Sequence, residues 1–147
     1  MKNLRKNNMP FIHQIRDIDQ FEEIYKLVDQ PCSTQEKIFY TMIEGTRCLS
    51  VEDLFNEFAI KLKFPDYFGA NWDAFDECLN DLNWLASEKY ILFIKDFDYI
   101  LVDQIDEFDT FIDILKLTVD EWVSGRIGTL STSSFQIVIQ STNHLDY

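Results

Sequence analysis

The chain has 147 residues, of which 46% are hydrophobic and 15% aromatic, and its formal net charge at pH 7 is −13. This length is typical of one domain, and so many aromatic residues exclude a disordered chain. Its apolar runs are short, such as residues 90–94, and none approaches the length of a membrane-spanning helix. The basic residues near the start are followed by no apolar segment, so we expect no signal peptide and a cytoplasmic location.

The negative charge is distributed unevenly along the sequence. Residues 1–37 contain six basic and six acidic side chains, so the whole net charge of −13 falls on residues 38–147. Such a surface repels nucleic acid and anionic membranes, and we expect neither as a partner. It attracts a basic protein. The alternative is that the acidity only keeps the chain in solution.

Cysteine and histidine residues are too few and too scattered for a metal site. The three cysteines, Cys32, Cys48 and Cys78, form no C-x-x-C pair, and only two histidines are present. We therefore expect reduced thiols, no bound metal and no cofactor.

Apolar periodicity and turn residues predict strands that alternate with helices. In chain order we expect a strand at 11–15, a helix at 17–28, a strand at 37–43, a helix at 51–62, a helix at 71–83, a strand at 89–96, a helix at 103–123 and a strand at 135–141. The continuous apolar strands suit a sheet that is covered on both faces. The sequence therefore predicts a small α/β domain with a largely parallel sheet.

The helix expected at residues 71–83 has an apolar side and an acidic side. On a helical wheel, one side gathers Phe75, Cys78, Leu79 and Leu82. The opposite side gathers Asp73, Glu77, Asn80 and Asp81, with Asp76 on the flank. Asn71 is the expected N-cap, and Gly69 is expected to allow a tight entry into the helix.

Asp73 and Glu77 are separated by four residues, so their carboxylates point the same way. Like charges at this spacing destabilise an isolated helix by about 0.2–0.5 kcal/mol, so folding alone does not favour the pair. One interpretation is a solvated face in which water screens the acids. The other is an array of anions that imitates consecutive phosphates and fits a cleft lined with Arg, Lys and His.

The segment FPDYFGANWDAFDECL, residues 64–79, resembles the signature of barstar-type ribonuclease inhibitors. The positions that match in register are Pro65, Asp66, Tyr67, Phe68, Gly69, Asn71, Trp72, Asp73, Ala74, Phe75, Glu77, Cys78 and Leu79. The order of strands and helices extends the resemblance over residues 37–141. It implies a barstar-like domain at 37–147, with a three-stranded parallel sheet surrounded by helices, and an N-terminal extension at 1–36, a strand and helix packed on the core.

The resemblance implies an inhibitor rather than an enzyme. Its partner would be a cognate basic ribonuclease toxin, and the chain would act as the immunity protein, or antitoxin, of the cell that makes the toxin. The implied partner-binding residues are Tyr67, Phe68, Asn71, Asp73, Asp76, Glu77, Asn80 and Asp81. Among these, Asp73 and Glu77 would enter the nuclease cleft, Tyr67 would pack against a catalytic His or an Arg, and Asn71 would cap the helix at the interface.

Three positions depart from the family pattern. Glu77 stands where the family usually has Asp, Phe68 replaces a second Tyr, and Asp76 stands where some members have Trp. Because partner choice depends on the placement of charges, these departures leave the fold intact but leave the identity and substrate of the nuclease open.

Two alternative functions remain at this level. The fold could serve as a regulatory binding module that inhibits no nuclease, or Asp73 and Glu77 could belong to a small acid/base hydrolase. A hydrolase requires a recessed carboxyl with a raised pKa, whereas an inhibitor requires both acids exposed. The sequence leaves the oligomeric state open. We also expect residues 37–147 to remain folded when residues 1–36 are removed.

Overall fold

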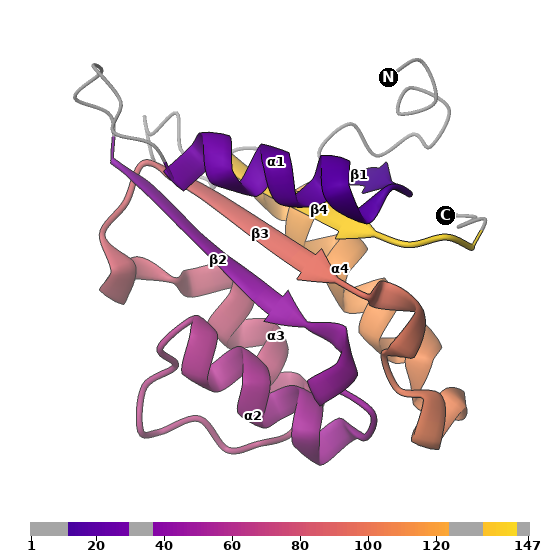
Figure 1. The fold of residues 1–147 in the computed structure, drawn as a ribbon. Helices are drawn as coiled ribbons and strands as arrows, with labels where there is room; N and C mark the ends of the chain where they lie inside the picture. The colour runs from indigo at the N-terminus through magenta and orange to yellow at the C-terminus, as the bar shows by residue number, and fades with distance from the viewer. Residues whose placement is uncertain (1–11, 30–36, 124–133, 144–147) are drawn as a thin grey trace.

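The computed structural model describes residues 12–29, 37–123 and 134–143. In chain order these form β1 (Ile12–Ile15), α1 (Ile18–Asp29), β2 (Ile38–Glu44), the 3₁₀ turn η2 (Gly45–Arg47), α2 (Val51–Lys61), α3 (Trp72–Asp81), η3 (Asn83–Leu85), β3 (Lys89–Lys95), η4 (Phe97–Tyr99), η5 (Val102–Glu107), α4 (Phe108–Val123) and β4 (Ser134–Gln140) (Figure 1). The expected α/β class is confirmed. Cys32 lies outside the described residues.

The strands form one parallel sheet in the order β1-β4-β3-β2. In its register, Ile43 of β2 lies opposite Ile94 of β3, and Ile94 lies opposite Ile139 of β4. The three strands predicted for residues 37–147 are β2, β3 and β4, and β1 adds a fourth strand to the same sheet among the described residues. This strand, expected in an extension packed on the core, pairs directly with β4 through Ile12 opposite Ile137.

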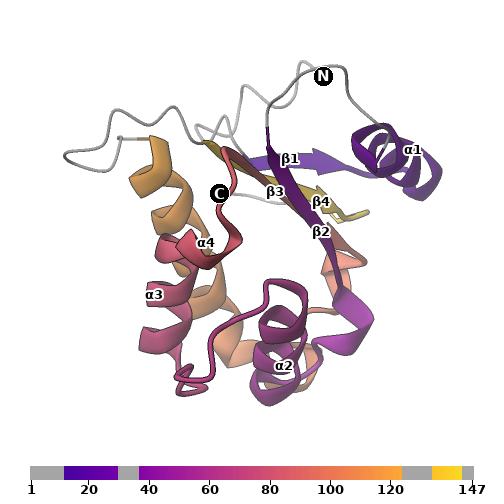
Figure 2. The same ribbon diagram turned by 90° about the vertical axis from the view of Figure 1, so that its left-hand side faces the viewer.

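Helices cover both faces of the sheet, as the continuous apolar strands predicted. Figure 2 shows α2, α3 and α4 on one face and α1 alone on the other. Alternate residues of β3 divide accordingly: Leu92 and Ile94 belong to the larger apolar cluster, and Phe93 belongs to the smaller cluster with Phe21 of α1. Each strand thus contributes side chains to two separate cores.

The N-terminal segment is a structural part of this domain. Asp17 caps α1, because its Oδ1 accepts from Asp19 N at 2.8 Å and from Gln20 N at 3.2 Å. Phe21 is fully buried and packs edge-on against Phe93, with ring centroids 5.7 Å apart. Removing this segment would expose Phe93 and leave β4 unpaired on one side. We now expect truncation to destabilise the domain, and the division at residue 36 stays a prediction.

The fourth helix begins later than the sequence predicts. Residues 102–107 form η5, and Gln104 has the non-helical angles φ −142°, ψ 61°. The Gln104 side chain accepts a hydrogen bond from Val51 N at 2.7 Å, and Asp103 N donates to Leu49 O at 3.0 Å. These bonds tie the segment to the start of α2, so the regular helix starts only at Phe108.

Two further expectations from the sequence concern membrane-spanning helices and the state of the cysteine thiols. In the described part of the chain, no helix is long and apolar enough to cross a membrane. Cys48 and Cys78 are buried free thiols. Burial raises the pKa of Cys78. It also raises that of Cys48, with a contribution from the nearby Glu57 carboxylate, to about 12.

Candidate functional site

Helix α3 is fixed at its first turn and along its inner side. Asn71 Oδ1 accepts from Ala74 N at 2.8 Å, which confirms the predicted N-cap. Phe75, Cys78 and Leu79 are buried, as the helical wheel predicts. Packing of this inner side leaves the acidic side of α3 directed away from the core.

The loop before α3 presents one aromatic side chain to solvent and buries most of another. Tyr67 is 73% exposed. Phe68 is half-buried, and its ring lies edge-on to Phe64 and Phe55, with centroids 4.9 Å and 5.7 Å away. The loop thus offers the Tyr67 ring to a partner, while Phe68 mainly attaches the loop to the core.

Gly69 is not the left-handed residue of the tight entry into α3, although a Cβ at this position would lie only 3.1 Å from Asn71 Nδ2. The residue in the left-handed region is Ala70, with φ 51°, and the Gly69 φ lies outside that region. The Gly69 carbonyl accepts a hydrogen bond from Asn71 Nδ2 at 3.3 Å. The Asn71 side chain therefore braces the turn on one side and caps the helix on the other.

Asp73 and Glu77 are both exposed on the outer side of α3. Neither makes a hydrogen bond or an ion pair with the part of the chain that the structure describes. The sequence from Lys63 to Lys89 contains no other basic residue. These two carboxylates are therefore available to a cation from another molecule.

The other polar residues of α3 make hydrogen bonds within α3 or with the 3₁₀ turn η3 that follows it. Asn80 Nδ2 donates to the Asp76 side chain at 2.9 Å and to the Asp76 carbonyl at 3.0 Å. Asp81 Oδ1 accepts from Asn83 N at 3.3 Å. All three residues Asp76, Asn80 and Asp81 are half-buried. The predicted set therefore divides into two exposed acids and a flank that is already partly hydrogen-bonded.

A contact that the sequence did not predict adds another acid to this region. The indole Nε1 of Trp72 donates to Glu107 Oε2 of η5 at 3.1 Å. The available signal was the Trp72 indole N–H, which usually finds a partner when its ring is packed. Because Trp72 also packs against Phe55 and Phe75, this bond attaches η5 to the first turn of α3.

Within the described residues, no group of three or more His, Cys, Asp or Glu side chains could hold a metal ion. The acids of α3 thus lie along a ridge instead of converging on one point. This arrangement suits contact with several cations of a partner surface.

The family model for barstar, described as barnase inhibitor, matches residues 38–140. This chain belongs to the barstar family. A search of curated proteins found no match. The barstar match begins at the first residue of β2 and ends at the last residue of β4. It therefore covers three strands of the sheet, whereas β1 and α1 lie outside it.

Proposed function

We propose that this barstar family member inhibits a basic ribonuclease by placing Asp73 and Glu77 in its active-site cleft. The observation that carries the proposal is that both carboxylates are exposed and unpaired among the described residues, inside the matched segment. In this mechanism the chain blocks RNA and performs no chemistry itself.

The chemistry of the cleft explains why acids would fill it. A ribonuclease binds the phosphates of RNA with Arg, Lys and His side chains, and carboxylates form strong charge-assisted hydrogen bonds with the same groups. One helical turn separates Asp73 from Glu77, so the two can meet different cations. The extra methylene of Glu77 extends its reach and restricts which cleft accepts it.

The rest of the site supports the two acids. In this proposal the exposed Tyr67 ring packs on a His ring or an Arg guanidinium of the partner. Asn71 holds the first turn of α3 in place, and Asp76, Asn80 and Asp81 would lie at the edge of the contact. Phe68 acts mainly through packing.

The net charge favours rapid capture. At −13, the chain attracts a basic nuclease over several ångströms, and such steering raises association rates to roughly 10⁸–10⁹ per molar per second. Speed matters if the chain is the immunity protein of a cell that makes or meets the toxin. That role, in the cytoplasm, is part of the proposal.

The exposure of both acids argues against the hydrolase alternative. General acid–base catalysis at neutral pH calls for a carboxyl whose pKa is raised in a recessed, poorly solvated setting. Asp73 and Glu77 instead lie on the outer side of a helix.

The test is an RNA-cleavage assay with a basic ribonuclease, chosen by pull-down with this chain from the products of the neighbouring genes. The purified chain is titrated into the enzyme with a fluorogenic RNA, and the variant Asp73→Ala/Glu77→Ala is titrated in parallel. We expect the wild type to abolish cleavage near one equivalent and the variant to leave cleavage unchanged at the same concentration.

A matched control removes the same two residue types from the other face of the molecule. Asp19 and Glu23 are also an exposed Asp and Glu four residues apart, on α1, and Asp19→Ala/Glu23→Ala gives the same net charge as the test variant. The control should inhibit like wild type. Binding without inhibition would indicate the regulatory module, and equal inhibition by both variants would overturn the proposed site.

A further inference from the structure

Strand β2 is an edge of the sheet with a sequence that favours self-pairing. Within the described residues it pairs only with β3. Its residues 38–43, IFYTMI, are uncharged, contain no Gly or Pro, and are rich in β-branched and aromatic side chains. Six-residue segments of this kind pair readily with identical segments of other chains. An exposed edge with this sequence is therefore a site for association with a second copy.

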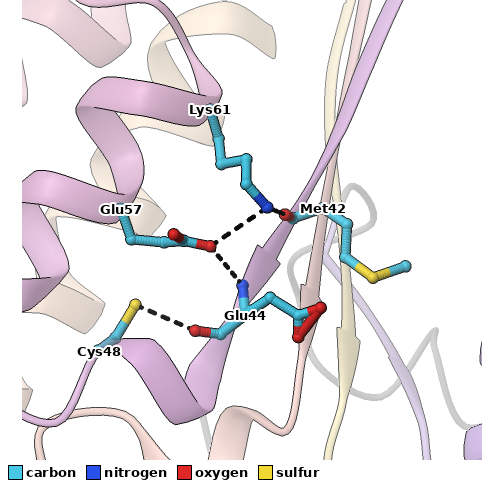
Figure 3. Close-up of polar contacts among 5 residues, drawn as sticks. All are labelled: Met42, Glu44, Cys48, Glu57 and Lys61. Carbon is cyan, nitrogen blue, oxygen red and sulfur yellow. Dashed lines mark hydrogen bonds and ion pairs between the residues drawn. The ribbon is translucent and has the colours of Figure 1, made fainter.

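Two side chains of α2 occupy the end of this edge (Figure 3). Glu57 Oε2 accepts from Glu44 N at 2.9 Å, and Lys61 Nζ donates to Met42 O at 2.7 Å. The two side chains also form an ion pair at 3.3 Å. Glu57 is only 5% exposed, although it is charged.

The positions of these bonds show which backbone groups face outward. Along a strand, successive residues direct their N–H and C=O groups to opposite sides. Since Met42 O and Glu44 N bond to α2, the outward residues of β2 are Met42 and Glu44 and, by alternation, Tyr40 and Ile38. A pairing strand would need these same groups.

The Cys48 thiol bonds to the other outward backbone group of Glu44, its carbonyl. Its Sγ donates to Glu44 O at 3.4 Å, and the raised pKa keeps the thiol protonated and able to donate. Both outward groups of Glu44 and the carbonyl of Met42 thus have partners from outside the sheet.

We propose that Glu57 and Lys61 form an edge guard that prevents β2 of a second copy from pairing with this sheet. An incoming strand would have to displace Lys61 from Met42 O and Glu57 from Glu44 N. It would leave the buried Glu57 carboxylate without the hydrogen bond from Glu44 N, which is unfavourable. The guard leaves the outward groups of Ile38 and Tyr40 open, but a strand that pairs there cannot continue along the rest of β2. This inference is independent of the proposed ribonuclease inhibition.

The test compares two variants with identical net charge. Glu57→Ala/Lys61→Ala removes the guard, and Glu23→Ala/Lys26→Ala removes an acid and a base that are both exposed on α1. By size-exclusion chromatography with light scattering, we expect the guard variant to have at least twice the mass of wild type and of the control. An unchanged mass for a guard variant with native circular dichroism would overturn the proposal.

A second variant serves if the first does not fold, and hydrogen exchange locates the contact between the copies. If the first variant lacks native circular dichroism, Glu57→Met/Lys61→Met, which keeps roughly the same side-chain volumes but offers no acceptor to Glu44 N and no donor to Met42 O, is used in the same comparison. Hydrogen exchange then locates the new contact. We expect the amides of Tyr40 and Met42 to gain at least tenfold protection in the associated species. Association without that protection would place the contact elsewhere and contradict the edge guard.

Discussion

Helices α1 and α3 each carry one Asp and one Glu at equivalent positions within the helix. Asp19 and Glu23 of α1, like Asp73 and Glu77 of α3, are exposed residues four positions apart, and each pair begins at the second residue of its helix. A capping side chain precedes both, Asp17 for α1 and Asn71 for α3.

Their surroundings differ. Helix α1 has Lys26 in its last turn, and Glu22 between the two acids pairs with Lys95 at 3.5 Å. Helix α3 has no basic residue of its own, follows the exposed Tyr67, and lies within the matched barstar segment. Spacing alone therefore does not define a binding site. The lack of a basic residue within α3 and the exposed aromatic ring before it distinguish α3.

The largest expected difference between the helices is in affinity for the nuclease. Removing a buried, paired acid at an interface costs about 2–5 kcal/mol, so Asp73→Ala/Glu77→Ala should weaken binding by roughly 10³-fold or more. Asp19→Ala/Glu23→Ala should change it by less than about threefold. Isothermal titration calorimetry measures both, and equal losses would end the distinction between the helices.

The next effect concerns the inner side of α1. Phe21 is fully buried, and Phe21→Ala should lower the free energy of unfolding by about 3–5 kcal/mol, because it leaves a cavity against Phe93. Leu27→Ala, at a 64% exposed position of the same helix, should change little. Urea denaturation gives both values. A small effect at Phe21 would mean that α1 contributes little to folding.

Kinetics should separate long-range attraction from direct contact. Both acid-pair variants lose the same charge, so both should associate with the nuclease somewhat more slowly, and the wild-type rate should fall steeply with added salt. Only the α3 variant should also dissociate faster. Stopped-flow mixing resolves the two rates, and an association rate independent of salt would contradict steering.

The two caps should have similar effects on stability and different effects on binding. Asn71→Ala and Asp17→Ala should each lower the free energy of unfolding by about 1 kcal/mol, since each removes an acceptor from the first turn of a helix. Only Asn71→Ala should also weaken nuclease binding. Thermal denaturation with and without the nuclease tests this, and equal shifts in the presence of the nuclease would count against a role for Asn71 at the interface.

The smallest effect is expected within α3 itself. Asp76 already accepts a hydrogen bond from Asn80, so Asp76→Asn should change the binding free energy by less than about 1 kcal/mol. Titration against the nuclease beside Asp73→Asn gives the comparison. A loss at Asp76 equal to that at Asp73 would extend the central contact across the flank.

Most of the fold followed from local patterns. The apolar runs of β2, β3 and β4 and the capping residue Asn71 were predicted closely, because strand hydrophobicity and cap chemistry are local properties. The pairing of β1 with β4 could not be predicted in this way. It depends on contacts between residues more than 120 positions apart.

The candidate site was predicted in the positions of its acids and less well in their surroundings. The helical wheel separated Asp73 and Glu77 from the core, but it could not show that Phe68 packs on Phe55. It also could not show that a charged Glu57 is buried, because its partners are backbone groups of another element. The Glu57–Lys61 spacing was the one available signal, and such pairs are usually exposed.

The pairing of the first strand with the last has a consequence for synthesis in the cell. As the chain leaves the ribosome, β1 and α1 emerge early, yet the strand they require, β4, is made after all the other described elements. Contacts so distant in sequence slow folding. Until then Phe21 and its neighbours lack their full packing surface, so incomplete chains would be open to proteolysis, and protection would begin only with complete molecules.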